Sequence, residues 1–180
     1  MYYGNIKLID IADGDGVRVS LFVSGCRNHC KGCFSEQTWD FKYGKPFTPI
    51  EEFEIIEQCK KSYISGLTIL GGDPFEQENQ SALLSFIKKF KLNCPDKTLW
   101  MYTGYILDKD LKYGQRKYIQ GVTNEIIDCV DVLVDGPFIE SKKDLNLKFR
   151  GSSNQRILTK DQIKELYEVC HPAKAEDFSA

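Results

Sequence analysis

The sequence predicts an α/β fold, a partial (βα) barrel of about five or six mainly parallel strands. Short apolar runs alternate with segments whose apolar residues recur at helical spacing, and this alternation indicates a parallel sheet with crossover helices. The chain has 180 residues, whereas a complete eight-unit barrel typically takes about 250. The barrel is therefore expected to be incomplete, with an open side that suits a protein substrate.

Five apolar segments are expected to form strands, and a sixth short apolar run follows near the C-terminus. A turn signal at residues 13–16 separates the first two segments, and the next three each end in a glycine-bearing loop. The six segments are residues 6–11, 17–23, 67–70, 98–102, 130–134 and 157–158.

The first helix has a clear start signal. Thr48 can cap the helix, Pro49 suits its first turn and Glu51 can reach back to the cap. Apolar residues continue at helical spacing, and the helix is expected to end near Gly66. A second helix is expected after the glycine motif at residues 71–74.

The second half of the chain gives weaker helix signals. Residues 107–130 are polar and are expected to hold one or two short helices. A capping box at residues 159–162 opens a helix that is expected to end near Cys170. The chain is thus expected to consist of one domain at residues 1–158, followed by a C-terminal helix and tail at residues 159–180.

Composition narrows the class of protein. Apolar residues make up 42% of the chain and charged residues 28%, as is typical of a soluble globular domain. The net charge is −2 and Lys and Arg do not cluster, so no nucleic-acid partner is expected. The sequence has neither a membrane-spanning stretch nor a signal peptide, so we expect a cytoplasmic protein with no membrane partner. In that reducing compartment the seven cysteines are not expected to form a disulfide framework.

Three cysteines carry the strongest chemical signal. Cys26, Cys30 and Cys33 lie within eight residues in a CxxxCxxC pattern, directly after an expected strand. This loop offers three soft sulfur ligands, whereas a closed zinc site and a saturated 4Fe-4S cluster each need four. The pattern therefore predicts one 4Fe-4S cluster that leaves one iron open to bind a small molecule.

Two other interpretations of these cysteines stay open at this point. They could be buried free thiols, although cysteines rarely cluster without a metal or redox role. They could also form a Cys₃His zinc site with His29 or His171 as the fourth ligand. However, His29 directly precedes Cys30 and cannot easily turn to the same ion.

The CxxxCxxC spacing matches the radical S-adenosylmethionine (SAM) superfamily. Further segments, in this order, resemble one family within it, the activating enzymes of anaerobic ribonucleoside-triphosphate reductase. The resemblance covers roughly residues 1–157, which leaves His171 outside it. The segments are residues 13–16, 21–26, 32–33, 38–39, 71–74, 102–105, 132–136 and 150–155.

The resemblance implies a fold, a reaction and partners. The fold would be the partial barrel of radical SAM enzymes. SAM would chelate the open iron of the cluster, and its reductive cleavage would give methionine and a 5′-deoxyadenosyl radical. This radical would take a hydrogen atom from one glycine of the large reductase subunit. A flavodoxin-like protein would supply the electron.

The resemblance also implies residues that hold SAM. Gly71, Gly72 and Asp73 would bind its amino group, although the same residues could form a plain tight turn. Many superfamily members carry Glu where this chain has Asp73. The contact could therefore come from the carboxylate or from the Gly72 backbone.

Three more contacts with SAM are expected. The segment Lys31-Gly32-Cys33-Phe34 would hold the adenine, with core packing as the alternative for Phe34. Asp135 would accept a ribose hydroxyl, or it would be a buried turn carboxylate. Arg150 and Asn154 would bind the SAM carboxylate, or they would order the C-terminal edge of the domain.

Two functional alternatives remain beside the reductase activase. The target could be another glycyl-radical enzyme of the pyruvate formate-lyase type, whose activase is similar. The chain could instead be a non-catalytic metal-binding or electron-transfer module.

Overall fold

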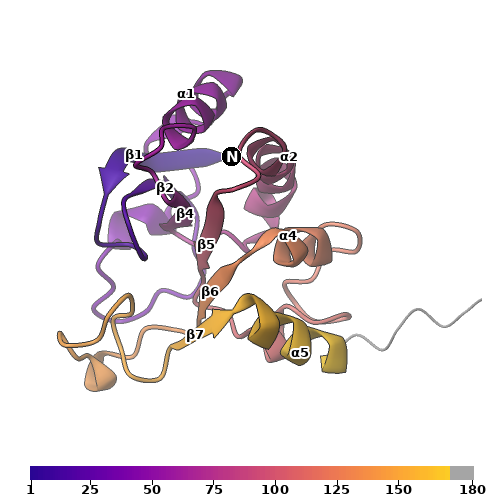
Figure 1. Ribbon diagram of the computed structural model, residues 1–180. Coiled ribbons are helices and arrows are strands. Elements are labelled where there is room, and N and C mark those ends of the chain that lie inside the picture. The colour runs from indigo at the N-terminus through magenta and orange to yellow at the C-terminus, as the bar shows by residue number, and fades with distance from the viewer. Residues whose placement is uncertain (171–180) are drawn as a thin grey trace, which may run out of the picture.

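The computed structural model describes residues 1–170 and contains a seven-stranded mixed sheet. The strand order is β3-β1-β2-β4-β5-β6-β7, and the helices lie along one face of the sheet (Figure 1). The strands are β1 (Tyr2–Asp10), β2 (Arg18–Val23), β3 (Lys45–Pro46), β4 (Gly66–Gly71), β5 (Thr98–Tyr102), β6 (Val132–Asp135) and β7 (Arg156–Thr159).

The centre of the sheet is parallel and its edges are antiparallel. β2, β4, β5 and β6 pair in parallel, whereas β1, β3 and β7 each pair antiparallel with a neighbour. Each of the six expected apolar segments overlaps a strand, although Ile11, Val17, Val130 and Asp131 lie just outside the strand ends. The expected number of strands was nevertheless too low, because β3 is a seventh. β3 has only two exposed residues, one of them a proline, so the sequence carries no apolar pattern there.

The helices largely follow their predicted start signals. They are α1 (Pro49–Cys59), α2 (Gln77–Asn93), α3 (Leu107–Asp110), α4 (Thr123–Cys129) and α5 (Lys160–Cys170), with 3-10 turns η1 (Glu36–Trp39) and η2 (Glu140–Lys142). The capping box at Thr48 is confirmed, since Glu51 accepts a 2.8 Å bond from the Thr48 amide. The expected end of α1 near Gly66 was wrong, because the helix stops at Cys59.

Apolar side chains on one face of the sheet form the core. Alternate residues of the central strands, such as Leu21, Ile69 and Met101, are fully buried and pack with Phe86 and Phe90 of α2. Because β2, β4, β5 and β6 are parallel, their carboxyl ends meet at one edge of the sheet. Within residues 1–170, no helix is both long enough and apolar enough to cross a lipid bilayer.

The other face of the sheet is polar, and the side chain of Arg18, at the start of β2, is buried on it. The guanidinium is 1% exposed, and its cation lies 5.4 Å above the ring of Trp100. Burial lowers the pKa of Arg18 to about 10, so the group is still charged at neutral pH. Its hydrogen bonds of 2.7 to 3.2 Å run to Thr68 Oγ1, Leu67 O, Thr98 O, Thr98 Oγ1 and Asp15 O.

We predict that Arg18→Met lowers the free energy of unfolding by about 2–4 kcal/mol. The reason is that several buried oxygen acceptors, which the guanidinium reaches together, would lose their hydrogen-bond donor. Denaturant unfolding of the two proteins measures the difference. Lys42→Met, at an exposed position, is the control and should change stability by less than about 0.5 kcal/mol. An Arg18→Met protein as stable as the parent would contradict this role.

Candidate functional site

Four loops meet at the carboxyl edge of the parallel strands. The cysteine loop (residues 24–35) follows β2, and residues 71–76, 103–106 and 136–140 follow β4, β5 and β6. The loops are tied by backbone bonds, among them Asp73 N to Gly25 O at 2.8 Å and Gly136 N to Tyr105 O at 3.0 Å. Parallel sheets commonly place their ligand sites at this edge.

The cysteine loop curls back on itself through left-handed residues. Gly25 and Gly32 have φ values of 99° and 70°, and His29 has a φ of 44°. Cys26 is buried at the end of β2, whereas Cys30 and Cys33 are half-buried and joined by a turn with Cys33 N 3.1 Å from Cys30 O. The loop thus brings three thiols to one end of the sheet.

The surroundings of Cys26 and Cys30 favour the neutral form of these two thiols. Burial, together with the nearby Asp73 carboxylate, raises the pKa of Cys26 to about 12. Burial and the neighbouring Cys33 also raise the pKa of Cys30. A bound metal centre would reverse this balance, because its positive charge stabilises thiolates.

The donor set of three cysteine thiols suits an iron-sulfur cluster. Within the part of the chain that the structure describes, no three His, Cys, Asp or Glu side chains converge closely enough to hold an ion as they stand. His29 does not turn toward the thiols, since its ring is stacked on Trp39 with 4.6 Å between centroids. His171 lies outside the described residues.

Gly71 and Gly72 lie against the cysteine loop. A Cβ at Gly71 would be 2.6 Å from Val23 O, and a Cβ at Gly72 would be 2.5 Å from Gly25 O. The Gly72 amide also donates a 2.7 Å hydrogen bond to Val23 O. The sequence indicated that these glycines allow a close approach of the backbone. In the structure the groups that they approach are the backbone carbonyls of Val23 and Gly25.

Asp73 is fully buried, and both of its oxygens already accept hydrogen bonds. Its donors are the amides of Phe75 and Gly104, the hydroxyl of Thr103 and the side-chain amide of Asn28, at 2.8 to 3.3 Å. Burial raises the pKa of Asp73 to about 7, although the hydrogen bonds from Phe75, Thr103 and Gly104 act in the opposite direction. The carboxylate therefore links the loops after β2, β4 and β5.

Glu76 is a central residue that the sequence analysis did not single out. Its carboxylate is fully buried and contacts Arg27 of the cysteine loop, Tyr105 and Lys117. Acidic residues are common at helix starts, so its place just before α2 gave no signal of this role.

Asp135 is also engaged. Arg156 donates to both of its oxygens, through Nε at 2.8 Å and through Nη2, and the Leu107 amide donates at 2.9 Å. The geometry at Asp135 is that of a buried turn carboxylate with a bidentate arginine partner.

Arg150 and Asn154 lie in the loop before β7. Arg150 Nη1 donates to Gln155 O at 2.7 Å, and Asn154 Nδ2 donates to Pro137 O at 2.8 Å. Asn154 Oδ1 is buried and accepts no hydrogen bond from the described residues. Of these two side chains, Asn154 therefore has an acceptor to spare for a ligand.

The segment expected to hold the adenine lies at the rim of the site. Lys31 Nζ forms an ion pair with Glu140 at 3.1 Å, and Gly32 faces the same carboxylate. Phe34 is 99% exposed, so the core-packing alternative for its ring was wrong.

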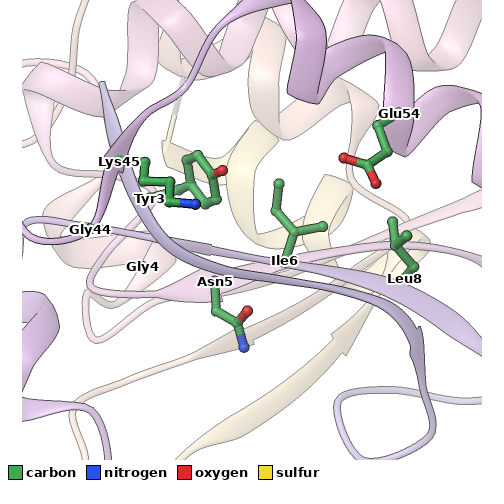
Figure 2. Close-up of a pocket in the computed structure, with 8 residues that line it drawn as sticks. All are labelled: Tyr3, Gly4, Asn5, Ile6, Leu8, Gly44, Lys45 and Glu54. Carbon is green, nitrogen blue, oxygen red and sulfur yellow. The ribbon is translucent and has the colours of Figure 1, made fainter.

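A surface groove of about 400 Å³ lies away from these loops. Figure 2 shows it between β1 and α1, with Ile6 and Leu8 turned toward Glu54 of the helix. None of the expected site residues lines it. The cavity and the cysteine chemistry therefore belong to different parts of the molecule.

Comparison with known proteins places the chain in a family. A family model for a 4Fe-4S single cluster domain matches residues 12–158. The anaerobic ribonucleoside-triphosphate reductase-activating protein of Pasteurella multocida is 43% identical over 87% of this chain and 96% of its own length. Proteins of the same name from Escherichia coli K12 and enterobacteria phage T4 are 37% and 36% identical, over 87% of this chain and 97% and 93% of their own lengths.

These matches span nearly the full length of the relatives and include the whole cysteine loop. The chain therefore belongs to the family of anaerobic ribonucleoside-triphosphate reductase-activating proteins, with a 4Fe-4S single cluster domain.

Proposed function

We propose that this chain reductively cleaves SAM and uses the 5′-deoxyadenosyl radical to generate a glycyl radical on the large subunit of the anaerobic ribonucleoside-triphosphate reductase. The observation that carries the proposal is the loop with Cys26, Cys30 and Cys33 at the carboxyl edge of four parallel strands. The names of the relatives favour the reductase over pyruvate formate-lyase as the target.

In this proposal Cys26, Cys30 and Cys33 hold a 4Fe-4S cluster, which supplies the electron for SAM cleavage. Three protein ligands leave one iron for the amino and carboxylate groups of SAM. The protein itself binds, orients and shields the reactants. No side chain needs to act as a general acid or base, because the step on the partner is a hydrogen-atom transfer.

The sheet is proposed to be the wall of a partial barrel of the radical SAM type, with the activase domain at residues 1–158 and a helix and tail at 159–180. The polar face of the sheet supports this arrangement. Tyr102 Oη is buried there without a hydrogen-bond partner among the described residues. Groups of this kind can be satisfied by a bound ligand.

The proposed SAM contacts differ in their support. For the amino group we favour the backbone of Gly72, because the Asp73 carboxylate is already engaged by four donor groups. Asn154 is the best-supported side-chain contact, through its unpartnered oxygen. Asp135 and Arg150 would have to exchange existing bonds to bind the ribose or carboxylate.

The adenine is proposed to lie along Lys31, Gly32, Cys33 and Phe34 at the rim. A flavodoxin-like protein is the proposed electron donor. The proposed compartment is the cytoplasm, and the six cysteines with described side chains are free thiols, in keeping with a reducing environment. Neither a nucleic acid nor a membrane is a proposed partner.

Replacing Cys26, Cys30 or Cys33 by Ala should abolish both cluster and activity, because two thiolates cannot hold the cluster that three support. Iron and sulfide analysis after anaerobic reconstitution measures the first, and a SAM cleavage assay the second. Cys59→Ala and Cys129→Ala are the controls, since these isolated thiols lie away from the loop. Full iron content in Cys30→Ala would contradict the assignment.

Asn154→Ala should weaken SAM binding about tenfold, the usual effect of losing one hydrogen bond in a buried site. The measurement is a SAM titration followed by the electron paramagnetic resonance spectrum of the reduced cluster. Asn124→Ala is a matched control, because Asn124 also has a buried, unpartnered amide oxygen but lies on α4. Equal affinities for the parent and Asn154→Ala would remove Asn154 from the site.

With the large reductase subunit, SAM and a reductant under anaerobic conditions, we expect a stable glycyl radical on that subunit. One methionine and one 5′-deoxyadenosine should form per radical, because each cleavage removes one hydrogen atom. Replacing the target glycine by alanine in the partner should remove the radical signal. Activation of pyruvate formate-lyase but not of the reductase would transfer the assignment to the other enzyme.

A further inference from the structure

The side chain of Glu76 binds Arg27, near the start of the cysteine loop. Glu76 lies just before α2, and its side chain is 0% exposed. Glu76 Oε1 accepts a 2.8 Å bond from the backbone amide of Arg27, the residue after Cys26. Glu76 Oε2 accepts a 2.7 Å bond from the guanidinium of the same arginine. One carboxylate thus holds both the main chain and the side chain of Arg27.

Two further donors complete the contacts of Glu76. Tyr105 Oη donates to Oε1 at 2.6 Å, and Lys117 Nζ donates to Oε2 at 2.5 Å. Tyr105 belongs to the loop after β5, and Lys117 to the segment before α4. The carboxylate therefore joins the cysteine loop to two segments that lie 29 and 41 residues beyond Glu76.

The charges around Glu76 are balanced only while it is ionised. Burial raises the pKa of Glu76, but the bonds from Lys117, Tyr105 and Arg27 outweigh it and hold the pKa below its usual value. Arg27 has a second, exposed acid partner in Glu78, at 2.5 Å. The buried ammonium of Lys117 has no carboxylate other than Glu76 within salt-bridge distance among the described residues.

The arginine held by Glu76 also covers the entry to the loop. Its guanidinium lies 4.3 Å above the ring of Phe41, and that ring lies against the backbone of Gly25. Arg27 is therefore fixed on one side by Glu76 and on the other by the aromatic ring. Cys26, between Gly25 and Arg27, has little freedom left.

We propose that Glu76 is a positioning residue that fixes the first half of the cysteine loop and balances the charge of Arg27 and Lys117 beside it. The loop-fixing role concerns the protein without its cluster. The charge-balancing role rests on the proposed function, because it acts on the cluster that the loop would hold.

The first test uses the cluster-free protein and the isosteric change Glu76→Gln. The amide has one acceptor oxygen where the carboxylate has two, so its NH₂ group must face a donor of Arg27 or Lys117. We expect the Arg27 backbone amide to exchange with deuterium about tenfold faster, measured by hydrogen exchange. Glu78→Gln, which removes only the exposed partner of Arg27, should leave that rate unchanged.

The second test measures the reduction potential of the reconstituted cluster. Glu76→Gln adds one unit of positive charge beside the loop, which stabilises the more negative reduced cluster, so its potential should rise. Adding Lys117→Met restores the charge balance. The double variant should return toward the parent potential while Arg27 exchange stays fast, a separation that a merely structural role would not produce.

Unchanged Arg27 exchange in a folded Glu76→Gln protein would overturn the positioning role, and a potential that Lys117→Met does not restore would overturn the charge role. If Glu76→Gln does not fold, the Lys117→Met variant tests the charge role by itself. It should lower the reduction potential of the cluster and leave the exchange of the Arg27 amide slow. An unchanged potential would overturn the charge role. If the parent takes up no cluster, the proposed function fails, and the exchange experiment still judges the positioning role.

Discussion

The cysteine loop depends on a contact between two stretches of bare backbone. β2 and β4 pair in register from Arg18 with Gly66 to Val23 with Gly71, and the loops that follow continue side by side. Bonds from Gly72 N to Val23 O and from Asp73 N to Gly25 O extend this pairing beyond the last strand residues. A single methyl group at either glycine would lie well inside contact distance of the opposite carbonyl. The two glycines therefore set where Cys26 stands.

Two buried carboxylates hold the loop, and their pKa values are shifted in opposite directions. Asp73 receives only neutral donors, and burial raises its pKa to about 7. Glu76 receives two cations and a tyrosine hydroxyl, which keep its pKa low despite burial. A buried acid is tolerated only where donors replace its lost water. Asn28 and Arg27, the residues bound by these acids, are neighbours in the cysteine loop.

The residues that hold the cysteine loop in place are different from the cysteines that are proposed to bind the cluster. The acids and glycines that contact the loop are engaged within the protein, whereas Cys30 and Cys33 are only half-buried. Phe34, the residue after Cys33, is almost fully exposed. A radical intermediate must be kept from solvent. We therefore expect the protein partner to supply the cover that this short chain lacks.

The sequence alone determined what depends on neighbours along the chain. The CxxxCxxC spacing, the capping box at Thr48 and the apolar strand segments are local patterns. The family resemblance likewise rests on the cysteine motif and on short segments such as residues 71–74 and 150–155. The number of strands, the end of α1 and the exposure of Phe34 were not predictable in this way, because they depend on which segments happen to pack nearby.

Only the tertiary structure decided the partners of the buried polar groups. Asp73 bonds Thr103 across 30 residues, Asp135 bonds Arg156 across 21, and Glu76 bonds Lys117 across 41. No local pattern encodes such a pair, since each forms only after the strands have brought distant loops to one edge. For that reason the sequence could propose metal ligands from the spacing of the cysteines but could not distinguish acids that hold the loops from acids free to bind a ligand.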